Sequence, residues 1–418
     1  MTASDPTPPQ RSSRASIRRY IPVTILGPLV GASLGIDGGP IFQILAVENL
    51  GLSAAAIGLA FGLGVVSLPI QLYASRLPIE SARRNVQIYL VLAALQAWVL
   101  AVLVGIGATG GLATVALGIT VIAEISLSVF LATAWQPLLA SGLDTYGRQR
   151  LNSTWPALAR GVLAGAVVLF AALESTGRSV FLAVVGALTI ATAVGLSAIA
   201  APRPAPPDAA TTPASRRSAT ALAPATRIAL VVFAAVNLGA IPLWLVYLDE
   251  VLWPSANLGA IAAVQTVASM AALLAWRSTD GDVTRRALVA STATLVAAVG
   301  VALLDGPVDS RAQQAVVVVA TALVAGGTTT VRIAMLEAAH RVVRPANTVR
   351  AFTLIDVVAS TSLQVGLLLS GLLITASADT GAGFADPYRG FVVFTSAATI
   401  PTILWFRKRS SEDDRQLA

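Results

Sequence analysis

The sequence predicts an all-α membrane protein with twelve transmembrane helices, arranged as two six-helix pseudo-repeats. The composition is 56% hydrophobic and only 12% charged, with a mean hydropathy of +0.77. A soluble domain carries about 25% charged residues because its surface faces water. Apolar runs of about 18 or more residues recur along the whole chain, and each is long enough to cross a hydrocarbon core of ~30 Å at 1.5 Å per residue.

These runs are too long and too uniformly apolar for the alternating strands, about ten residues long, of a membrane barrel. Helices also satisfy their backbone hydrogen bonds internally, as a segment in lipid must. The predicted spans are 21–42, 54–73, 86–106, 112–139, 152–173, 179–201, 228–248, 256–276, 286–304, 312–339, 351–376 and 389–406.

Arginines are distributed unevenly among the connections between these spans. Several occur in each segment on one side, beginning with the amino-terminal tail. The loops on the other side hold only Arg178, Arg311 and Arg389. Cytoplasmic loops carry the excess of basic residues in membrane proteins. We therefore expect a multi-pass protein of the cell membrane with both termini in the cytoplasm, and the basic pI reflects topology rather than nucleic-acid binding.

The chain divides near its middle. A stretch rich in Pro, Ala, Ser and Thr without an apolar period separates six spans from six spans, as a flexible linker does. Ser53–Gly58 and Ser255–Gly259 open corresponding spans with similar residues, which suggests duplicated halves around a central site. The predicted units are a disordered tail (1–20), an amino-terminal bundle (21–201), a cytoplasmic linker (202–227), a carboxy-terminal bundle (228–406) and a second tail (407–418).

With this layout the chain resembles the major facilitator superfamily over nearly its full length. The stretch Gly147–Gly165 and the segment Gly35–Gly38 are similar to the proton-linked efflux branch that includes drug, macrolide and siderophore exporters. The superfamily's basic loop motif keeps Arg76, Arg83 and Arg84 here but lacks its Gly and Asp. The antiporter motif on the fifth span is reduced to Gly161 and Gly165.

Ionisable residues inside spans are the main functional signal, since each costs at least about 2.5–3.5 kcal/mol at the membrane centre. They fall on the first, fourth, fifth, tenth and eleventh spans. The resemblance implies that these spans line or flank the central cavity, whereas the third, sixth, ninth and twelfth face lipid. The six residues are Asp37, Glu124, Arg160, Arg332, Glu337 and Asp356.

Asp37 is the best candidate for a proton-coupling residue, together with Glu124. The first span carries a four-residue glycine ladder suited to close helix packing, and Asp37 lies on the opposite face. Pro40 follows directly and predicts a kink or break beside the carboxylate. An inert, hydrogen-bonded Asp near the outer interface is the alternative. The ladder consists of Gly27, Gly31, Gly35 and Gly39.

Glu124 and Arg160 lie at similar depth on consecutive spans and are a candidate buried ion pair. Arg332 and Asp356 form a second candidate pair. The first pair suits either a gate or substrate anchor or, equally, a static bridge that stabilises the bundle. For the second pair the static bridge is favoured, because both residues lie nearer the cytoplasmic end of their spans. Further residues of a substrate path are Gln136, Trp135 and Asn237, although amides in spans often bond neighbouring helices.

No motif for catalysis, a cofactor or a metal is found. The chain has no cysteine and one histidine, and it lacks a phosphate-binding loop, so we expect no nucleotide. The sequence thus predicts a monomeric secondary transporter, not an enzyme, whose partners are the bilayer, protons and a small organic solute. Efflux of a lipophilic or secondary-metabolite compound is favoured. Proton-linked uptake of a small nutrient and a non-transporting membrane sensor or scaffold are the alternatives.

Overall fold

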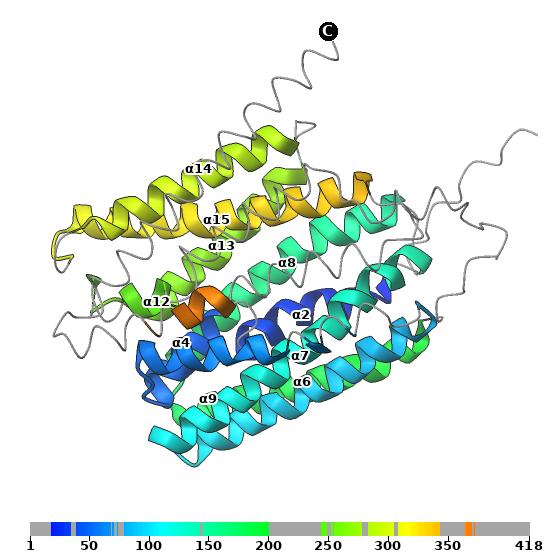
Figure 1. Cartoon of the computed structure of the whole chain (residues 1–418), viewed down its shortest axis with the longest axis horizontal. Coiled ribbons are helices and arrows are strands. Elements are labelled where there is room, and N and C mark those ends of the chain that lie inside the picture. Colours follow the sequence, from blue (N-terminus) through cyan, green and yellow to red (C-terminus); the bar gives the residue numbers. More distant parts are fainter. Residues whose placement is uncertain are drawn as a thin grey trace, which may run out of the picture.

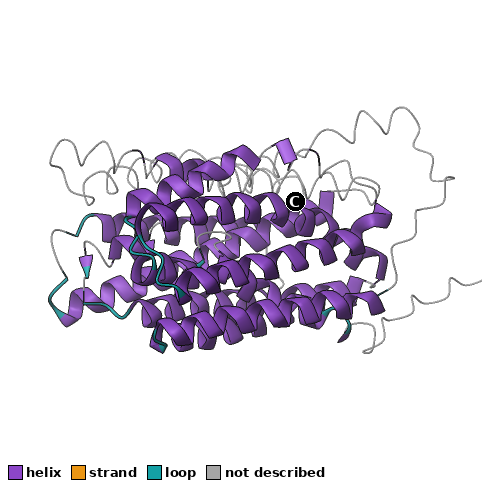
Figure 2. Cartoon of the chain, turned by 90° about the horizontal axis from the view of Figure 1, so that it is seen from below, coloured by secondary structure: helices purple, strands orange, loops and turns teal. Residues whose placement is uncertain are grey.

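The structure is a computed structural model in which the regular elements of the described residues are all helical. Figures 1 and 2 show these helices lying side by side along the long axis of the molecule. Apart from a few single positions, the described residues are 18–34, 39–67, 79–142, 145–199, 244–248, 255–277, 283–304, 308–342 and 364–369.

The helices before residue 200 are called the N-terminal group. Their apolar residues are the ones that predicted the first six spans, and long helices occur at the third to sixth of these. The group comprises α2 (Ile21–Leu34), α3 (Pro40–Ile44) with the π-helix η2 (Leu45–Asn49), α4 (Ala54–Gly62) with the 3₁₀ helix η3 (Leu63–Ser67), η4 (Ile79–Ser81), α6 (Ala82–Gly105), α7 (Gly110–Gly142), α8 (Thr145–Ala172), α9 (Ser175–Gly195) and η5 (Leu196–Ala198).

The helices after residue 243 are called the C-terminal group. Three of them are long and coincide with the predicted eighth, ninth and tenth spans. The group comprises α12 (Trp244–Tyr247), α13 (Leu258–Arg277), α14 (Val283–Ala302), α15 (Arg311–Val342) and a short helical stretch at 364–369.

Five of the described helices are long and apolar enough to cross a membrane: α6, the second part of α8, α9 with η5, α13 and the first part of α15. A shorter apolar helix is Gly110–Glu124 within α7. The predicted linker, the twelfth span and most of the seventh and eleventh spans lie outside the described residues. The count of twelve and the domain boundaries therefore stay predictions.

The first predicted span is interrupted. Helix α2 ends at Leu34, Gly39 has an extended conformation (φ −49°, ψ 145°), and α3 begins with Pro40 as its first residue. Proline is well suited to this position because the first helical N–H has no partner within the helix. The helix then widens into η2, a π-helical turn that ends at Asn49. The break that Pro40 predicts is thus present.

Each group packs mainly on itself. In the N-terminal group α6 contacts α9 and α7, and α2 contacts α8; in the C-terminal group α15 contacts both α13 and α14. The two groups meet where α8 packs along α13, which Figure 1 shows near the middle of the bundle. The contact between α8 and α13 is called the intergroup seam, and that between α6 and α9 the intragroup seam.

Candidate functional site

A carboxylate is buried between two helices of the N-terminal group. Glu124 of α7 is 1% exposed, and its Oε1 accepts a hydrogen bond of 3.1 Å from the hydroxyl of Tyr89 on α6, itself 1% exposed. One turn away, Gln96 of α6 donates to the carbonyl of Thr120 on α7 at 3.2 Å. A buried ionisable group held by a hydroxyl donor is a candidate site for binding and releasing a proton.

Arg160, the predicted partner of Glu124, is half-buried on α8. The bond that the structure places on Glu124 comes from Tyr89, which sequence reasoning missed because the pair spans 35 residues on two helices. The pairing of Glu124 with Arg160 stays a prediction. Gly161, the neighbour of Arg160, lies at the intergroup seam, because a Cβ at Gly161 would lie 3.3 Å from the Sδ of Met270 on α13.

Several predicted site residues cannot be placed with their side chains. Asp37, Gly35, Asp356, Asn237 and Arg76 lie outside the described residues. Gly31 lies in α2, Gln136 in α7, and Arg332 and Glu337 in α15, as expected, and only their backbone belongs to the described structure. Gly39, the last glycine of the predicted ladder, is the residue before α3. The proposed Asp37 site and the Arg332–Asp356 pair therefore stay predictions.

The glycine positions have different surroundings. A Cβ at Gly161 would contact Met270 closely, which agrees with a packing role. At Gly27 and Gly165, by contrast, a Cβ would meet no heavy atom of the described structure within 4 Å. Each of these two glycines thus faces open space in the described structure, and the packing role of the predicted glycine ladder stays a prediction.

Basic residues gather at one end of the N-terminal group, called the Arg83 end. Arg83 donates to the carbonyl of Ile199 at 2.8 Å, and Arg19 donates to that of Ala198 at 3.3 Å. These carbonyls follow the last turns of α9, where a positive charge is favourable. Arg84 is exposed. Two arginines of the predicted basic side thus share one end of the bundle.

Trp135, predicted as part of a substrate path, contacts Tyr20 near the start of α2, with ring centroids 6.1 Å apart and an interplanar angle of 68°. Tyr20 precedes α2 and is 4% exposed. Burial raises the pKa of the Tyr20 hydroxyl above 10.0, and the nearby positive charge of Arg19 partly offsets this effect. In this structure Trp135 packs against another helix of its own group.

The opposite end holds a buried arginine that sequence reasoning placed in an outside loop. Arg178, in the first turn of α9, is 7% exposed and forms a salt bridge of 2.5 Å with Glu48. It also donates to Asn49 Oδ1 at 2.8 Å and to the carbonyls of Phe170 and Ala171 at 3.0 and 3.1 Å. Its guanidinium lies 5.3 Å from the centroid of the Phe170 ring. We call this the Arg178 end.

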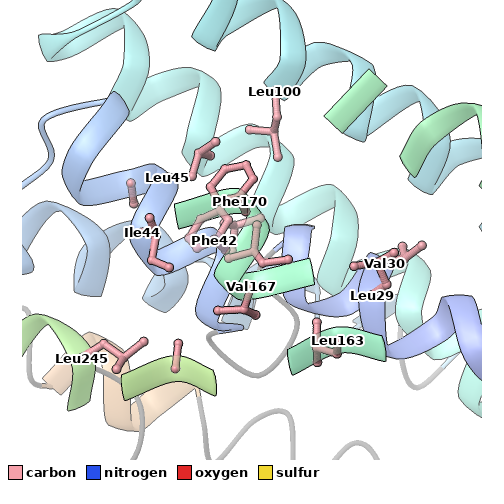
Figure 3. Packing of buried hydrophobic residues seen from close by; sticks show 14 of the residues in the cluster. Leu29, Val30, Phe42, Ile44, Leu45, Leu100, Leu163, Val167, Phe170 and Leu245 are labelled. Carbon is pink, nitrogen blue, oxygen red and sulfur yellow. The ribbon is translucent and has the colours of Figure 1, made fainter. Parts of the chain in front are cut away.

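Apolar side chains fill the bundle next to this end. Figure 3 shows Phe42, Ile44 and Leu45 of the α3–η2 segment beside Phe170 of α8 and Leu245 of α12. Phe42, Ile44, Leu45, Phe170 and Leu245 are all 0% exposed. Residues of both groups therefore pack into one apolar core beside the α3–η2 segment, and all five side chains are fully buried.

The two seams differ in chemistry. Across the intragroup seam Gln87 donates to Ala193, Trp98 to Ala183 and Ser179 to Ala101, at 3.0, 3.0 and 2.7 Å. The close contacts named across the intergroup seam are apolar: Gly161 with Met270, and Gly259 with Ala171. A third contact between the groups joins Gly62 of α4 and Leu368, where an added Cβ would lie 2.5 Å from the leucine Cβ.

Among solved structures, this fold is found in membrane transporters. A bacterial homologue of the iron transporter ferroportin in the outward-facing state is 15% identical, with a TM-score of 0.64 over 96% of this chain and 100% of that chain. A variant of the nucleoside transporter NupG is 11% identical, with a TM-score of 0.60 over 94% of this chain and 99% of that chain.

A bacterial homologue of the lysosomal transporter Spinster, inward-facing and occupied, is 14% identical, with a TM-score of 0.50 over 94% of both chains. No family model and no curated protein matches the sequence. At these identities the likeness shows the fold alone. The solved structures named here are those of transporters.

Proposed function

We propose that this chain is a secondary active transporter that moves a small organic solute across the cell membrane by alternating access. The observation that carries the proposal is the contrast between the seams. Hydrogen bonds join helices within the N-terminal group, whereas small and apolar residues make the named contacts between groups. Such an arrangement suits two rigid bodies that rock against each other around a central site.

Protons are the proposed coupling ion, and Asp37 and Glu124 are the proposed carriers. The described part of this site supports a role for Glu124, because its carboxylate is buried on α7, within a predicted span, next to the Tyr89 hydroxyl. An intramembrane carboxylate is costly unless it has such a partner, and it marks a functional position by default. Asp37 is proposed from its place immediately before the break at Gly39 and Pro40.

The proposed direction is efflux of a lipophilic or secondary-metabolite compound. The predicted spans hold few charges, which suits an amphipathic solute better than a highly polar nutrient. Proton-linked uptake of a small nutrient would require more hydrogen-bonding groups along the path. A passive sensor or scaffold would have no use for a carboxylate buried inside the bundle.

The test is transport in proteoliposomes with an imposed proton gradient and a panel of lipophilic compounds. We expect gradient-dependent movement that a protonophore abolishes and that Asp37→Asn or Glu124→Gln removes, with folding unchanged. Glu80→Gln serves as a matched control, because Glu80 is an exposed carboxylate in η4. Transport that survives both carboxylate substitutions would contradict the proton assignment, and no movement of any compound would favour the sensor or scaffold.

A further inference from the structure

Arg178 has an unusual position for a basic residue in an outer connection. It is 7% exposed, and its hydrogen-bond partners come from two distant parts of the chain. Glu48 and Asn49 end η2, the carbonyls of Phe170 and Ala171 end α8, and Arg178 itself begins α9. One guanidinium thus joins the outer part of the broken first span to the turn between α8 and α9.

The donor geometry of arginine explains why this residue type is present. Its planar guanidinium offers five N–H donors in a fixed fork, and it stays charged at any physiological pH. Here Nε and Nη2 bind the two carbonyls of α8, while Nη1 and Nη2 bind Asn49 and Glu48. The final carbonyls of a helix have no partner within it, so a cation that binds them also caps the helix.

The cluster is adjacent to the contact between the two groups. Ala171, whose carbonyl binds Arg178, is the residue whose side chain meets Gly259 of α13. That contact is so close that a Cβ added at Gly259 would overlap the Ala171 methyl group. The position of the α8 terminus, which Arg178 fixes, therefore also fixes the seam at this end.

We propose that Arg178 is a positioning residue of the transport cycle: it joins the α3–η2 segment to the ends of α8 and α9 as one unit. Opening of the Arg178 end then occurs at the Ala171–Gly259 contact, and the segment that carries Phe42 and Leu45 moves with α8. The inference rests on the proposed alternating-access function. It assigns the short, broken segment to the N-terminal group, although α3 also contacts α12 and α13.

The chain contains no cysteine, so a single introduced thiol reports on one position. Leu45→Cys places the reporter in η2, at a residue that is 0% exposed. Leu196→Cys places a second reporter in η5 at the Arg83 end, at a residue that is 1% exposed. The measurement is the rate of modification by a water-soluble maleimide in the purified full-length protein.

Arg178→Gln removes the charge and most of the donors. We expect the Leu45→Cys reporter to react about tenfold faster or more, because a hydrogen bond to a charged group contributes at least this factor. The Leu196→Cys reporter should be unaffected. An equal increase at both reporters would mean general destabilisation and would overturn the proposal, as would no increase at Leu45→Cys.

A charge-exchange variant distinguishes a helix-capping role of Arg178 from a simple ion pair with Glu48. The double variant Glu48→Arg/Arg178→Glu can restore the salt bridge, but a glutamate at 178 cannot donate to the carbonyls of Phe170 and Ala171. We expect labelling of Leu45→Cys to stay fast in this variant; slow labelling would overturn the capping role. These rates are independent of any solute, so a failure of the proposed transport function would be seen separately, as absent transport with the labelling pattern unchanged.

Discussion

The intragroup and intergroup seams are both contacts between long apolar helices, yet they are built differently. Between α6 and α9, side-chain donors bind backbone carbonyls of the facing helix, and Gly186 lies directly against Trp98. Between α8 and α13 the close contacts are Gly161 with Met270 and Gly259 with Ala171. Sliding would break the directional bonds of the first seam, whereas apolar surfaces can separate and meet again. The difference indicates that α6 and α9 move together, whereas α8 and α13 move relative to each other.

The largest expected effect on transport comes from a covalent bridge across the intergroup seam. The variant Gly161→Cys/Met270→Cys, treated with a short bis-methanethiosulfonate that bridges the two thiols through disulfides, should lose nearly all transport because α8 can no longer move relative to α13. Initial rates of solute uptake or release in proteoliposomes, before and after a reductant, measure the block and its reversal.

The matched control is Gly105→Cys/Ser179→Cys in the intragroup seam. A Cβ at Gly105 would lie 3.9 Å from the Ser179 Cβ, which is a suitable separation for a disulfide. This bridge should leave transport close to that of the parent. Equal inhibition by both bridges would contradict the assignment of α6 and α9 to one rigid unit.

The next largest effect is a loss of stability caused by steric overlap. Gly186→Val should lower the free energy of unfolding by about 1–3 kcal/mol, because its side chain would displace Trp98 and approach the carbonyl of Ala94. Thermal unfolding of the purified protein in detergent measures the loss. Gly165→Val is the matched control, since Gly165 faces open space in the described structure. A similar loss for both would show that valine lowers stability through the helix backbone rather than through the seam.

A smaller effect follows from one hydrogen bond of the same seam. Trp98→Phe keeps an aromatic ring but loses the indole N–H that donates to the carbonyl of Ala183 at 3.0 Å. We expect a loss of about 0.5–1.5 kcal/mol in stability. The loss should shrink when Gly186→Val is already present, because the displaced ring no longer makes this bond. Strictly additive losses in the double-mutant cycle would argue against that coupling.

Much of the fold was predictable because its signal is local. Uniform apolarity over about twenty residues requires a spanning helix in lipid, and Pro40 cannot continue a helix smoothly, so α6, α9, α13 and the break before α3 follow from composition and order alone. The charge pattern also identified Arg83 as belonging to the basic side, and the structure places it beside Arg19 at one end of the bundle.

The site was less predictable because its contacts join distant residues. Nothing near Glu124 in the sequence points to Tyr89, which lies 35 residues away on another helix. Arg178 has the sequence context of an exposed loop residue, and its burial depends on Glu48, 130 residues earlier, and on the end of α8. The glycine spacing suggested packing at Gly27 and Gly165, but spacing alone does not show whether a helix lies opposite.

The smallest effect concerns a contact within the N-terminal group at the Arg83 end. Burial raises the pKa of Tyr20 above its usual value of 10.0, so the folded protein holds this proton more tightly than the unfolded chain does. The contribution of the protonated Tyr20 hydroxyl to the free energy of unfolding is fully present below about pH 10.0. It is lost as the pH rises through the pKa that Tyr20 has in the folded protein. Tyr20→Phe keeps the ring against Trp135 and removes the titrating hydroxyl.

We therefore expect parent and Tyr20→Phe to unfold at similar temperatures at pH 8. Between pH 10 and 11 the parent should lose more stability than the variant, since only the parent carries the Tyr20 phenol. Arginines titrate higher still and are common to both proteins, so the difference between them isolates Tyr20. Parallel curves across this range would mean that water reaches the hydroxyl, and that the contact between the start of α2 and Trp135 of α7 is open rather than part of the rigid N-terminal group.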